Sequence, residues 1–428
     1  MEPCFIPGKI LLPAADVPVS RWACLACDQF TSQPDYWEQA AALAAGGPSA
    51  LNIVLPEVYL DKVDTPTRIR AIHAAMEEYR AGVLTRAVNG YIYLERTQSD
   101  GRVRPGLVGL LDLEQYDWRP GSCPAVRPTE GTVPSRIPPR LEVRRGACLE
   151  SPHVMMLADD PAHRLLGPIA AQKHRLPLVY QGELALGGGF VRGWAVEDAA
   201  LLSGVRAALE ALGSQAAFDQ AYPAAAGQPP LTLAVGDGNH SLATAKAFWE
   251  ELKPTLPESE RAGHPARWCL AEVCDVHCEA ISFEPIHRVV FGVPGMQLLA
   301  RLKEWCADRH IAVDGPPAAC EQTITLVHGA WRRPVRLADS PEPLAVGTVE
   351  AFLADYLKRN PASSVDYIHG EEAVAELCEA GNTGILLPPF EKSDLFRGVV
   401  LGGVLPRKTF SMGHARDKRY YLECRAIL

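Results

Sequence analysis

The stretch AVGDGNHSLATAKAFWEEL, Ala234–Leu252, decides the fold expected for this chain. An apolar run over residues 231–235 breaks at Gly236-Asp-Gly238 and is followed by an alanine-rich sequence typical of a helix. Glycine accepts backbone angles that are closed to other residues and lets a ligand approach the main chain closely. The pattern therefore predicts a strand, a sharp turn and a helix, with room for a ligand at the turn.

The residue types in this turn indicate an anion site. A helix starting near Ser241 would point its unpaired N–H groups and its positive dipole end at the turn, and such helix starts bind phosphate. Asn239, His240 and Ser241 offer donors to phosphate oxygens. Asp237 would repel a bare phosphate, so it is expected to hold a magnesium ion, a ribose hydroxyl or its own turn. The alternative is a purely structural turn in which Asp237 or Asn239 caps the helix and His240 packs in place.

The bulk composition narrows the setting. The chain has 428 residues, of which 47% are hydrophobic and 22% charged, and this is typical of a globular protein with two or three domains or one elaborated domain. The formal net charge of −9 argues against nucleic-acid or anionic-membrane partners. No run reaches the about 18 apolar residues of a membrane helix, and the amino end lacks the pattern of a signal peptide. A cytoplasmic location is expected, and the oligomeric state, including a homo-oligomer, is left open.

Twelve cysteines raise the alternative of a metal site. Cys24 and Cys27 could join Cys274, His277 and Cys278, but the second group has the wrong spacing for a zinc ribbon, and both groups lie in apolar sequence. We interpret the cysteines as small core residues.

The rest of the chain alternates strand-like and helix-like segments, and residues 118–140 are rich in proline and predict a long irregular segment. This mixture predicts an α/β or α+β protein with a mixed sheet and helices. Strands are predicted at residues 9–13, 23–28, 90–96, 104–112, 176–180, 190–196, 231–235, 267–282, 322–328 and 383–387. Helices are predicted from residue 34 and at residues 65–84, 196–212, 241–252, 297–309, 349–357 and 371–380.

Four ordered motifs resemble those of the prokaryotic family called domain of unknown function 1015. GDGNHSLATA resembles its ADGHHRYETA pattern, and Arg127-Pro-Thr-Glu-Gly-Thr132, followed by Arg136 and Arg140, resembles its His-Glu-Lys-Thr segment and trailing arginine. Phe283-Glu-Pro-Ile-His-Arg288 is similar to its Leu-Pro-Thr-His-Arg segment. Leu405-Pro-Arg-Lys-Thr-Phe-Ser411 is similar to its Met-Pro-Pro-Lys-Ser-Thr segment. The match spans nearly the whole chain.

The box of that family is similar to one in the ParB and sulfiredoxin superfamily, which includes free-serine kinases. The resemblance implies a ParB/sulfiredoxin-like nucleotide-binding core. It also implies that Glu130 accepts the hydroxyl proton, while Asp237, Gly238, Asn239 and His240 bind phosphate and metal. We accordingly expect three regions: an α/β region at 1–115, the core at 116–292, and an α/β region at 293–428 carrying LPRKTFS.

Two departures from the family pattern concern charge. Ser241 stands where the box usually has arginine, and no histidine precedes Glu130 at position 127 or 129. The loss of a fixed positive charge means that another cation must offset the phosphate, or that the site does different chemistry. The candidate phosphate ligands from the matching segments, each of which could instead be an ordinary solvated or structural side chain, are Arg136, Arg140, His287, Arg288, Arg407, Lys408 and Thr409.

Asp28 is a second carboxylate that could bind magnesium together with Asp237, or cap the helix that follows it. The sequence thus predicts a phosphotransferase that uses ATP or ADP and magnesium on a small hydroxyl metabolite, with serine as the first candidate. Two alternatives stay open: a phosphatase acting on a compound such as phosphoserine, and a non-catalytic nucleotide-binding switch. Each catalytic reading requires Glu130 and Asp237, 107 positions apart, to meet in one cleft.

Overall fold

Two compact units make up the chain. The computed structural model describes the chain except residues 1–2, 32, 61–63, 152–153, 317–320 and 407. Unit 1 comprises Met1–Ile281 and His414–Leu428, and unit 2 comprises Ser282–Gly413. This division differs from the three regions expected, because strands from both sides of residue 115 pair within one sheet of unit 1.

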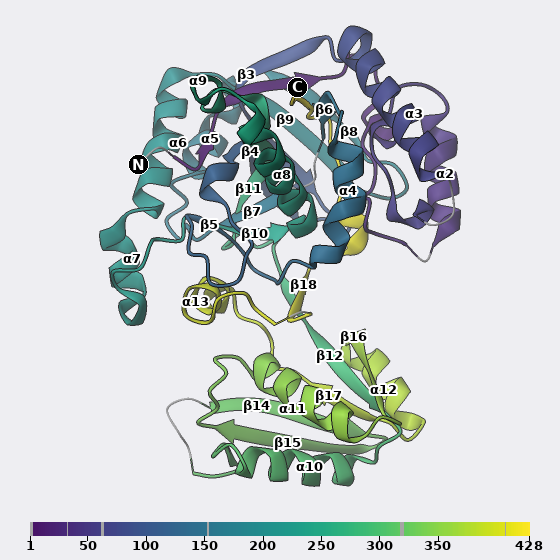
Figure 1. Ribbon diagram of the computed structural model, residues 1–428, viewed down its shortest axis with the longest axis vertical. Coiled ribbons are helices and arrows are strands. Elements are labelled where there is room, and N and C mark those ends of the chain that lie inside the picture. Colours follow the sequence, from purple (N-terminus) through teal and green to yellow (C-terminus); the bar gives the residue numbers. More distant parts are fainter. Residues whose placement is uncertain (1–2, 32, 61–63, 152–153, 317–320, 407) are drawn as a thin grey trace. The chain divides into compact units, whose positions relative to one another are not determined.

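A mixed sheet, ten-stranded in the described residues, forms the centre of unit 1 (Figure 1). Its main path runs β5-β10-β7-β11-β4-β3-β9-β8, with β1 on β4 and β2 on β3. The pairs β5–β10 and β7–β11 are parallel, and the other neighbours are antiparallel. The strands are β1 (Phe5–Ile6), β2 (Gly8–Leu12), β3 (Arg86–Thr97), β4 (Val103–Asp112), β5 (Val126–Pro128), β7 (Met155–Ala158), β8 (Leu178–Glu183), β9 (Phe190–Val196), β10 (Leu233–Asp237) and β11 (Trp268–Asp275). A separate pair joins β6 (Leu149–Glu150) to β19 (Arg425–Ala426).

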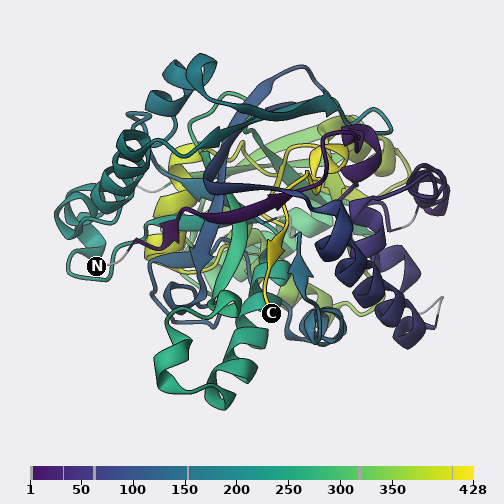
Figure 2. The same ribbon diagram turned by 90° about the horizontal axis from the view of Figure 1, so that it is seen from above.

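Helices cover both faces of this sheet, so its central strands β4, β7 and β11 are mostly buried on two sides. Alternation along β3 sends Ile92 and Leu94 into one core and Tyr91 and Tyr93 into the other. The first core is closed by α2 and α3, and the second by α5, α6 and α8. Figures 1 and 2 show α2 and α3 on the side of the sheet opposite to α6. The helices of unit 1 are α1 (Val19–Trp22), α2 (Pro34–Ala44), α3 (Thr65–Glu78), α4 (Ile137–Arg144), α5 (Gly167–Gln172), α6 (Ala199–Leu212), α7 (Gln215–Ala221), α8 (Asn239–Leu252) and α9 (Glu258–Arg261).

Gly90 in β3 lies where the backbones of neighbouring strands pack closely. A Cβ at this position would overlap the carbonyl oxygen of Val196 in β9. We therefore expect Gly90→Ala to destabilise unit 1 by roughly 1–3 kcal/mol, because backbone atoms must shift. Gly204 in α6 is the matched control, since a Cβ there meets no atom within 4 Å. Gly204→Ala is expected to stabilise by about 0.5–1 kcal/mol. Urea unfolding of both variants checks the prediction, and equal midpoints would contradict it.

Unit 2 consists of an antiparallel sheet with helices packed against it. Its sheet runs β13-β15-β14-β17-β12-β16, with β18 on β12, and all of these pairs are antiparallel. Side chains of α10 and α11 pack into one core and those of α12 into another. The elements are β12 (Phe283–Phe291), β13 (Ala312–Val313), β14 (Glu321–His328), β15 (Trp331–Ala338), β16 (Ser364–His369), β17 (Thr383–Leu386), β18 (Phe410–Met412), α10 (Gly295–Ala307), α11 (Ala345–Arg359), α12 (Glu371–Glu379) and α13 (Lys392–Gly402).

The mixed α/β class expected from the sequence is confirmed, and two local predictions are wrong. Residues 118–140 are not irregular throughout, because they contain β5 and the start of α4. Residues 23–28 form no strand and make a single bridge, between Leu25 and Arg419. Within the described residues, we find no helix of the length and apolarity required to cross a membrane.

Candidate functional site

The opening motif folds as a strand, a glycine turn and a helix. β10 ends at Asp237, Gly238 takes a left-handed conformation with φ of 80°, and α8 begins at Asn239. Because the cap residue is a glycine, it offers no side-chain acceptor to the first amides of α8. The Oδ1 atom of Asp237 accepts a hydrogen bond of 2.9 Å from the Gly238 amide. Asp237 therefore binds the backbone of its own turn, which is one of the roles expected for it. The cap residue of α8 is Gly238, and neither Asp237 nor Asn239 caps the helix.

Strand β5 brings the Glu130 segment beside this turn. Val126 pairs with Leu233 and Pro128 with Val235 in parallel register, which is the same offset of 107 positions that separates Glu130 from Asp237. Asp237 is the last residue of β10, and Glu130 lies two residues beyond the end of β5. Both carboxylates therefore lie at the carboxyl ends of two neighbouring parallel strands, the edge at which ligands bind in open α/β sheets.

Two further hydrogen bonds hold the segment after β5 against the turn. The Thr129 hydroxyl donates to the Val235 carbonyl over 2.7 Å. The Val133 amide donates to Nε2 of His240 over 3.2 Å. The His240 ring thus has a structural contact in this arrangement, and its predicted role toward phosphate stays a prediction.

Lys418 is a functional candidate that the sequence motifs did not reveal. Its Nζ lies 3.3 Å from Oδ2 of Asp237, and its side chain is 21% exposed. Burial alone would lower the pKa of this ammonium, but the carboxylates of Asp237, Asp28 and Glu130 raise it above its usual value. All three carboxylates singled out in the sequence therefore act on one ammonium group. The lysine lies in no recognisable motif, so no sequence signal pointed to it.

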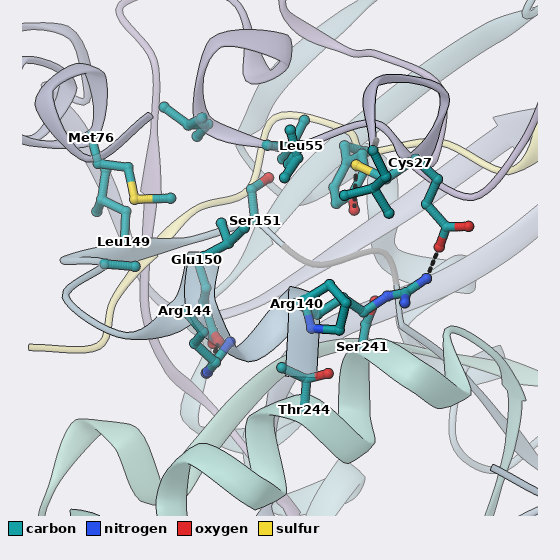
Figure 3. A pocket seen from close by; sticks show the side chains of 18 residues that line it. Cys27, Leu55, Met76, Arg140, Arg144, Leu149, Glu150, Ser151, Ser241 and Thr244 are labelled. Carbon is teal, nitrogen blue, oxygen red and sulfur yellow. Dashed lines mark hydrogen bonds and ion pairs between the residues drawn. The ribbon is translucent and has the colours of Figure 1, made fainter. Parts of the chain in front are cut away.

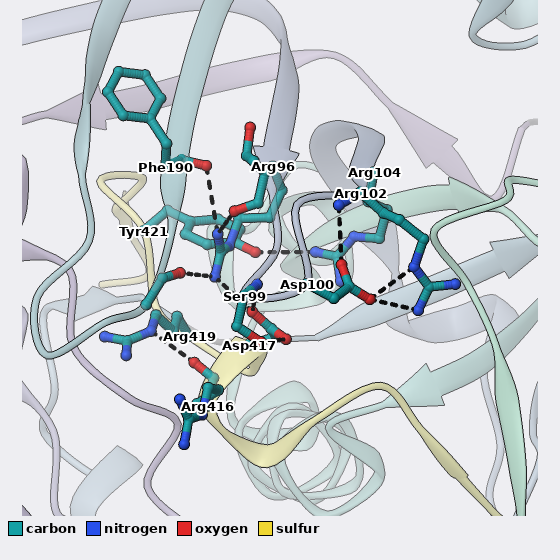
Figure 4. A network of polar contacts seen from close by, with 12 residues as sticks. Arg96, Ser99, Asp100, Arg102, Arg104, Phe190, Arg416, Asp417, Arg419 and Tyr421 are labelled. Atoms are coloured by element: carbon teal, nitrogen blue, oxygen red, sulfur yellow. Dashed lines mark hydrogen bonds and ion pairs between the residues drawn. The ribbon is translucent and has the colours of Figure 1, made fainter.

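The backbone around Lys418 is held on both sides. The Ala26 amide donates to the Lys418 carbonyl over 2.8 Å, and the Tyr420 amide donates to the Cys24 carbonyl over 2.9 Å. Asp417, the preceding residue, is buried and accepts hydrogen bonds from Ser99 and Arg96 (Figure 4). These contacts tie the C-terminal segment to β3 and to residues 24–26, and they fix the position from which the lysine side chain starts.

Glu423 in the same segment gives unit 1 a pH dependence. Burial raises the pKa of its carboxyl to about 7, and the Tyr180 hydroxyl is its hydrogen-bond partner. The unfolded chain loses this proton near its ordinary pKa of 4.5, whereas the folded chain keeps it until about 7. The unfolded state therefore binds fewer protons in this window, and stability falls as the pH rises from 4.5 to 7.

We expect Glu423→Gln, which is neutral at every pH, to remove this contribution. Urea unfolding of wild type and variant near pH 5 and near pH 8 measures it, since most of the window in which the proton count differs lies between these values. The stability of the variant should fall less than that of the wild type over this interval. An equal fall in both proteins would contradict the assignment.

A cavity opens beside the start of α8. It has a volume of about 140 Å³ and is lined by polar side chains that include Arg140 and Ser241 and by apolar ones that include Leu55, Met76 and Leu149. Figure 3 shows Arg140 near Ser241, while Met76 and Leu149 lie at another part of the cavity.

Arg140 and Arg136 already have a shared partner. Both side chains pair with Glu57, Arg136 at 3.3 Å. Glu57 offsets one of their two positive charges in this arrangement, and their predicted contact with a nucleotide stays a prediction.

The described residues contain no group of three or more His, Cys, Asp or Glu side chains placed to hold a metal ion. Asp28 is exposed and accepts a hydrogen bond of 2.9 Å from the Gln29 side chain. It does not cap α2, whose cap residue is Gln33. Magnesium usually takes one or two carboxylates together with water and substrate phosphates. Asp237 and Asp28 therefore fit this ion only in company with the phosphates of a nucleotide.

The remaining predicted ligands belong to unit 2. His287 is buried in β12, its Nδ1 accepts the Leu387 amide over 3.2 Å, and burial lowers its pKa. Arg288 is fully buried and pairs with Glu350 at 2.8 Å. Lys408 is exposed with φ of 58°, and the Thr409 hydroxyl donates to Pro406 over 2.5 Å. Arg407 lies outside the described residues. His287, Arg288 and Thr409 thus have partners within unit 2.

Unit 1 is a mixed α/β structure in which a glycine turn and the carboxylates of Glu130 and Asp237 lie at one edge of the sheet. The family described as "Protein of unknown function (DUF1015)" matches residues 6–368, so the chain belongs to this family. The family resemblance read from the four motifs is thereby confirmed.

Similar solved structures include a mutant free serine kinase in complex with ADP, with 11% identity, a TM-score of 0.38, and coverage of 75% of this chain and 93% of that one. A C-terminally truncated SbnI from Staphylococcus aureus has 11% identity, a TM-score of 0.36, and coverage of 72% and 82%. A conserved hypothetical protein from Pyrococcus furiosus has 11% identity, a TM-score of 0.34, and coverage of 72% and 90%. No curated protein matches the chain.

Proposed function

We propose that this protein transfers a phosphoryl group between a nucleotide, ATP or ADP, and the hydroxyl of a small metabolite, with L-serine as the first candidate. Unit 1 would then contain the ParB/sulfiredoxin-like nucleotide-binding core that the motifs imply. The observation that carries the proposal is the register of β5 on β10, which brings Glu130 and Asp237 to one sheet edge beside the glycine-capped start of α8.

Each part of this edge has a role that its chemistry allows. The first amides of α8 donate to the phosphate oxygens, and Asn239 and Ser241 add side-chain donors. Asp237, with Asp28 nearby, holds the magnesium ion that accompanies the phosphates. Glu130 accepts the proton of the attacking hydroxyl. Phosphoryl transfer needs mainly positioning and positive charge around the moving group, and in this set the helix start and the magnesium ion would supply positive charge.

The test is phosphorus NMR of the purified protein with magnesium and L-serine. Parallel samples contain ATP, ADP or pyrophosphate as the donor, and one sample contains phosphoserine alone. A phosphoserine signal that requires a donor supports the proposal and identifies the donor. Phosphate released from phosphoserine without any donor would favour a phosphatase instead. No reaction in any sample, together with tight nucleotide binding, would favour a binding switch.

A further inference from the structure

The first turn of α8, with the sequence Asn-His-Ser-Leu, carries no lysine or arginine that could bind the proposed phosphate. A helix start alone contributes partial charges, whereas phosphate recognition in proteins commonly adds an arginine or a lysine. Arg136 and Arg140 both pair with Glu57, so one of their two positive charges is already offset. A further cation from another part of unit 1 would strengthen phosphate binding at the start of α8.

We propose that Lys418 is this cation and that its ammonium binds the phosphate oxygens of the nucleotide at the start of α8. The inference rests on the proposed function and adds to it a binding residue outside every motif. Lys418 contacts Asp237, the residue immediately before the α8 cap, at 3.3 Å. A phosphate bound at the first amides of α8 would therefore lie within reach of the Lys418 side chain.

The lysine is prepared for this contact by its surroundings. Its side chain is mostly buried, and its backbone is bonded to Ala26 and flanked by the anchored Asp417. A free surface lysine loses up to about 2 kcal/mol of rotamer entropy when it is fixed on a ligand, and a lysine already held in place loses less. Phosphate binding would exchange the ion pair with Asp237 for one with the ligand, and Asp237 would turn to the magnesium ion.

The charges of Asp28, Glu130, Asp237 and Lys418 bear on a second requirement for nucleotide binding. Asp28, Asp237 and Glu130 all act on the ammonium of Lys418, so three carboxylates lie around the proposed phosphate site. A phosphate without a metal ion would be repelled by these carboxylates. Nucleotide binding at this edge is therefore expected to require both Lys418 and magnesium.

Calorimetric titration of the full chain with ADP and with adenosine, each with and without magnesium, tests this inference. We expect Lys418→Met to weaken magnesium-ADP binding by about 10- to 100-fold, the range expected for losing one hydrogen bond to a charged group, and to leave adenosine binding unchanged. Lys418→Arg should restore most of the affinity. Lys9→Met, which removes an exposed lysine from β2, is the matched control and should bind like the wild type.

Lys418→Met leaves the Asp237 carboxylate without the ammonium it pairs with, and this could impair folding. A second variant therefore controls for a folding defect. Lys418→Met combined with Asp237→Asn removes both charges and should fold, yet it should bind magnesium-ADP as weakly as the single variant or more weakly. Wild-type affinity in Lys418→Met would overturn the inference while leaving the proposed function intact. Absence of nucleotide binding in the wild type would overturn both, so the two failures are distinguishable.

Discussion

Glu130→Gln is expected to lower kcat for phosphoryl transfer by roughly 100- to 10,000-fold, the usual contribution of a general base. Glutamine keeps the size and polarity of the side chain but cannot accept the hydroxyl proton. Glu130 lies two residues beyond the end of β5, and Asp237 is the last residue of the neighbouring strand β10. The Kd of magnesium-ADP should therefore change by no more than about twofold, because the interaction lost acts in the transition state.

The phosphorus NMR assay and calorimetry measure these two effects on the same preparations. Glu142→Gln is the matched control, since Glu142 lies on nearby α4 with its side chain 58% exposed. The control should retain wild-type kcat. If Glu130→Gln turned over like the control, Glu130 would not be the base, and the convergence of β5 and β10 would have only a structural meaning.

Glu272→Ala is expected to produce the largest loss of stability, about 3–5 kcal/mol, because it leaves a buried charge without its partner. Glu272 of β11 pairs with Arg104 of β4 at 3.0 Å, and the two side chains are 5% and 4% exposed. The same guanidinium nitrogen donates to the Tyr421 hydroxyl over 2.9 Å, which links the sheet to the C-terminal segment (Figure 4). The substitution would therefore loosen the segment that carries Lys418 as well.

Hydrogen exchange in increasing urea separates unit 1 from unit 2 and measures this loss strand by strand. Glu210→Ala is the control, because Glu210 makes an exposed pair with Arg206 in α6 and such pairs contribute little. We expect the amides of β4 and β11 to lose protection in Glu272→Ala and to keep it in Glu210→Ala. Similar protection in both variants would show that the buried pair is not required.

Most of the regular elements could be predicted from the sequence, because their signals are local. The hairpin of β3 and β4 follows from two apolar runs around Gln98–Gly101, and α3 follows from helical spacing of apolar residues. The turn before α8 follows from its two glycines, although the helix starts at Asn239 and not at Ser241. Each of these elements is defined by residues within about 20 positions of one another, the range over which periodicity carries information.

The missed features depend on contacts between distant parts of the chain. β5 has three residues, includes Pro128 and lies in a proline-rich segment, so its pairing with the distant β10 makes it a strand. Lys418 gains its environment from Asp28, Glu130 and Asp237, which are separated from it by at least 180 positions. Lys408 was predicted instead, because it lies in a segment that resembles a family motif.

A crystal structure of the full chain grown with ADP and magnesium would locate the nucleotide. We expect the terminal phosphate within hydrogen-bond distance of the first amides of α8 and of Nζ of Lys418. We also expect the Asp237 carboxylate to face the metal ion. ADP bound elsewhere, with the Lys418–Asp237 pair intact and the start of α8 without phosphate, would show that this sheet edge is not the nucleotide site.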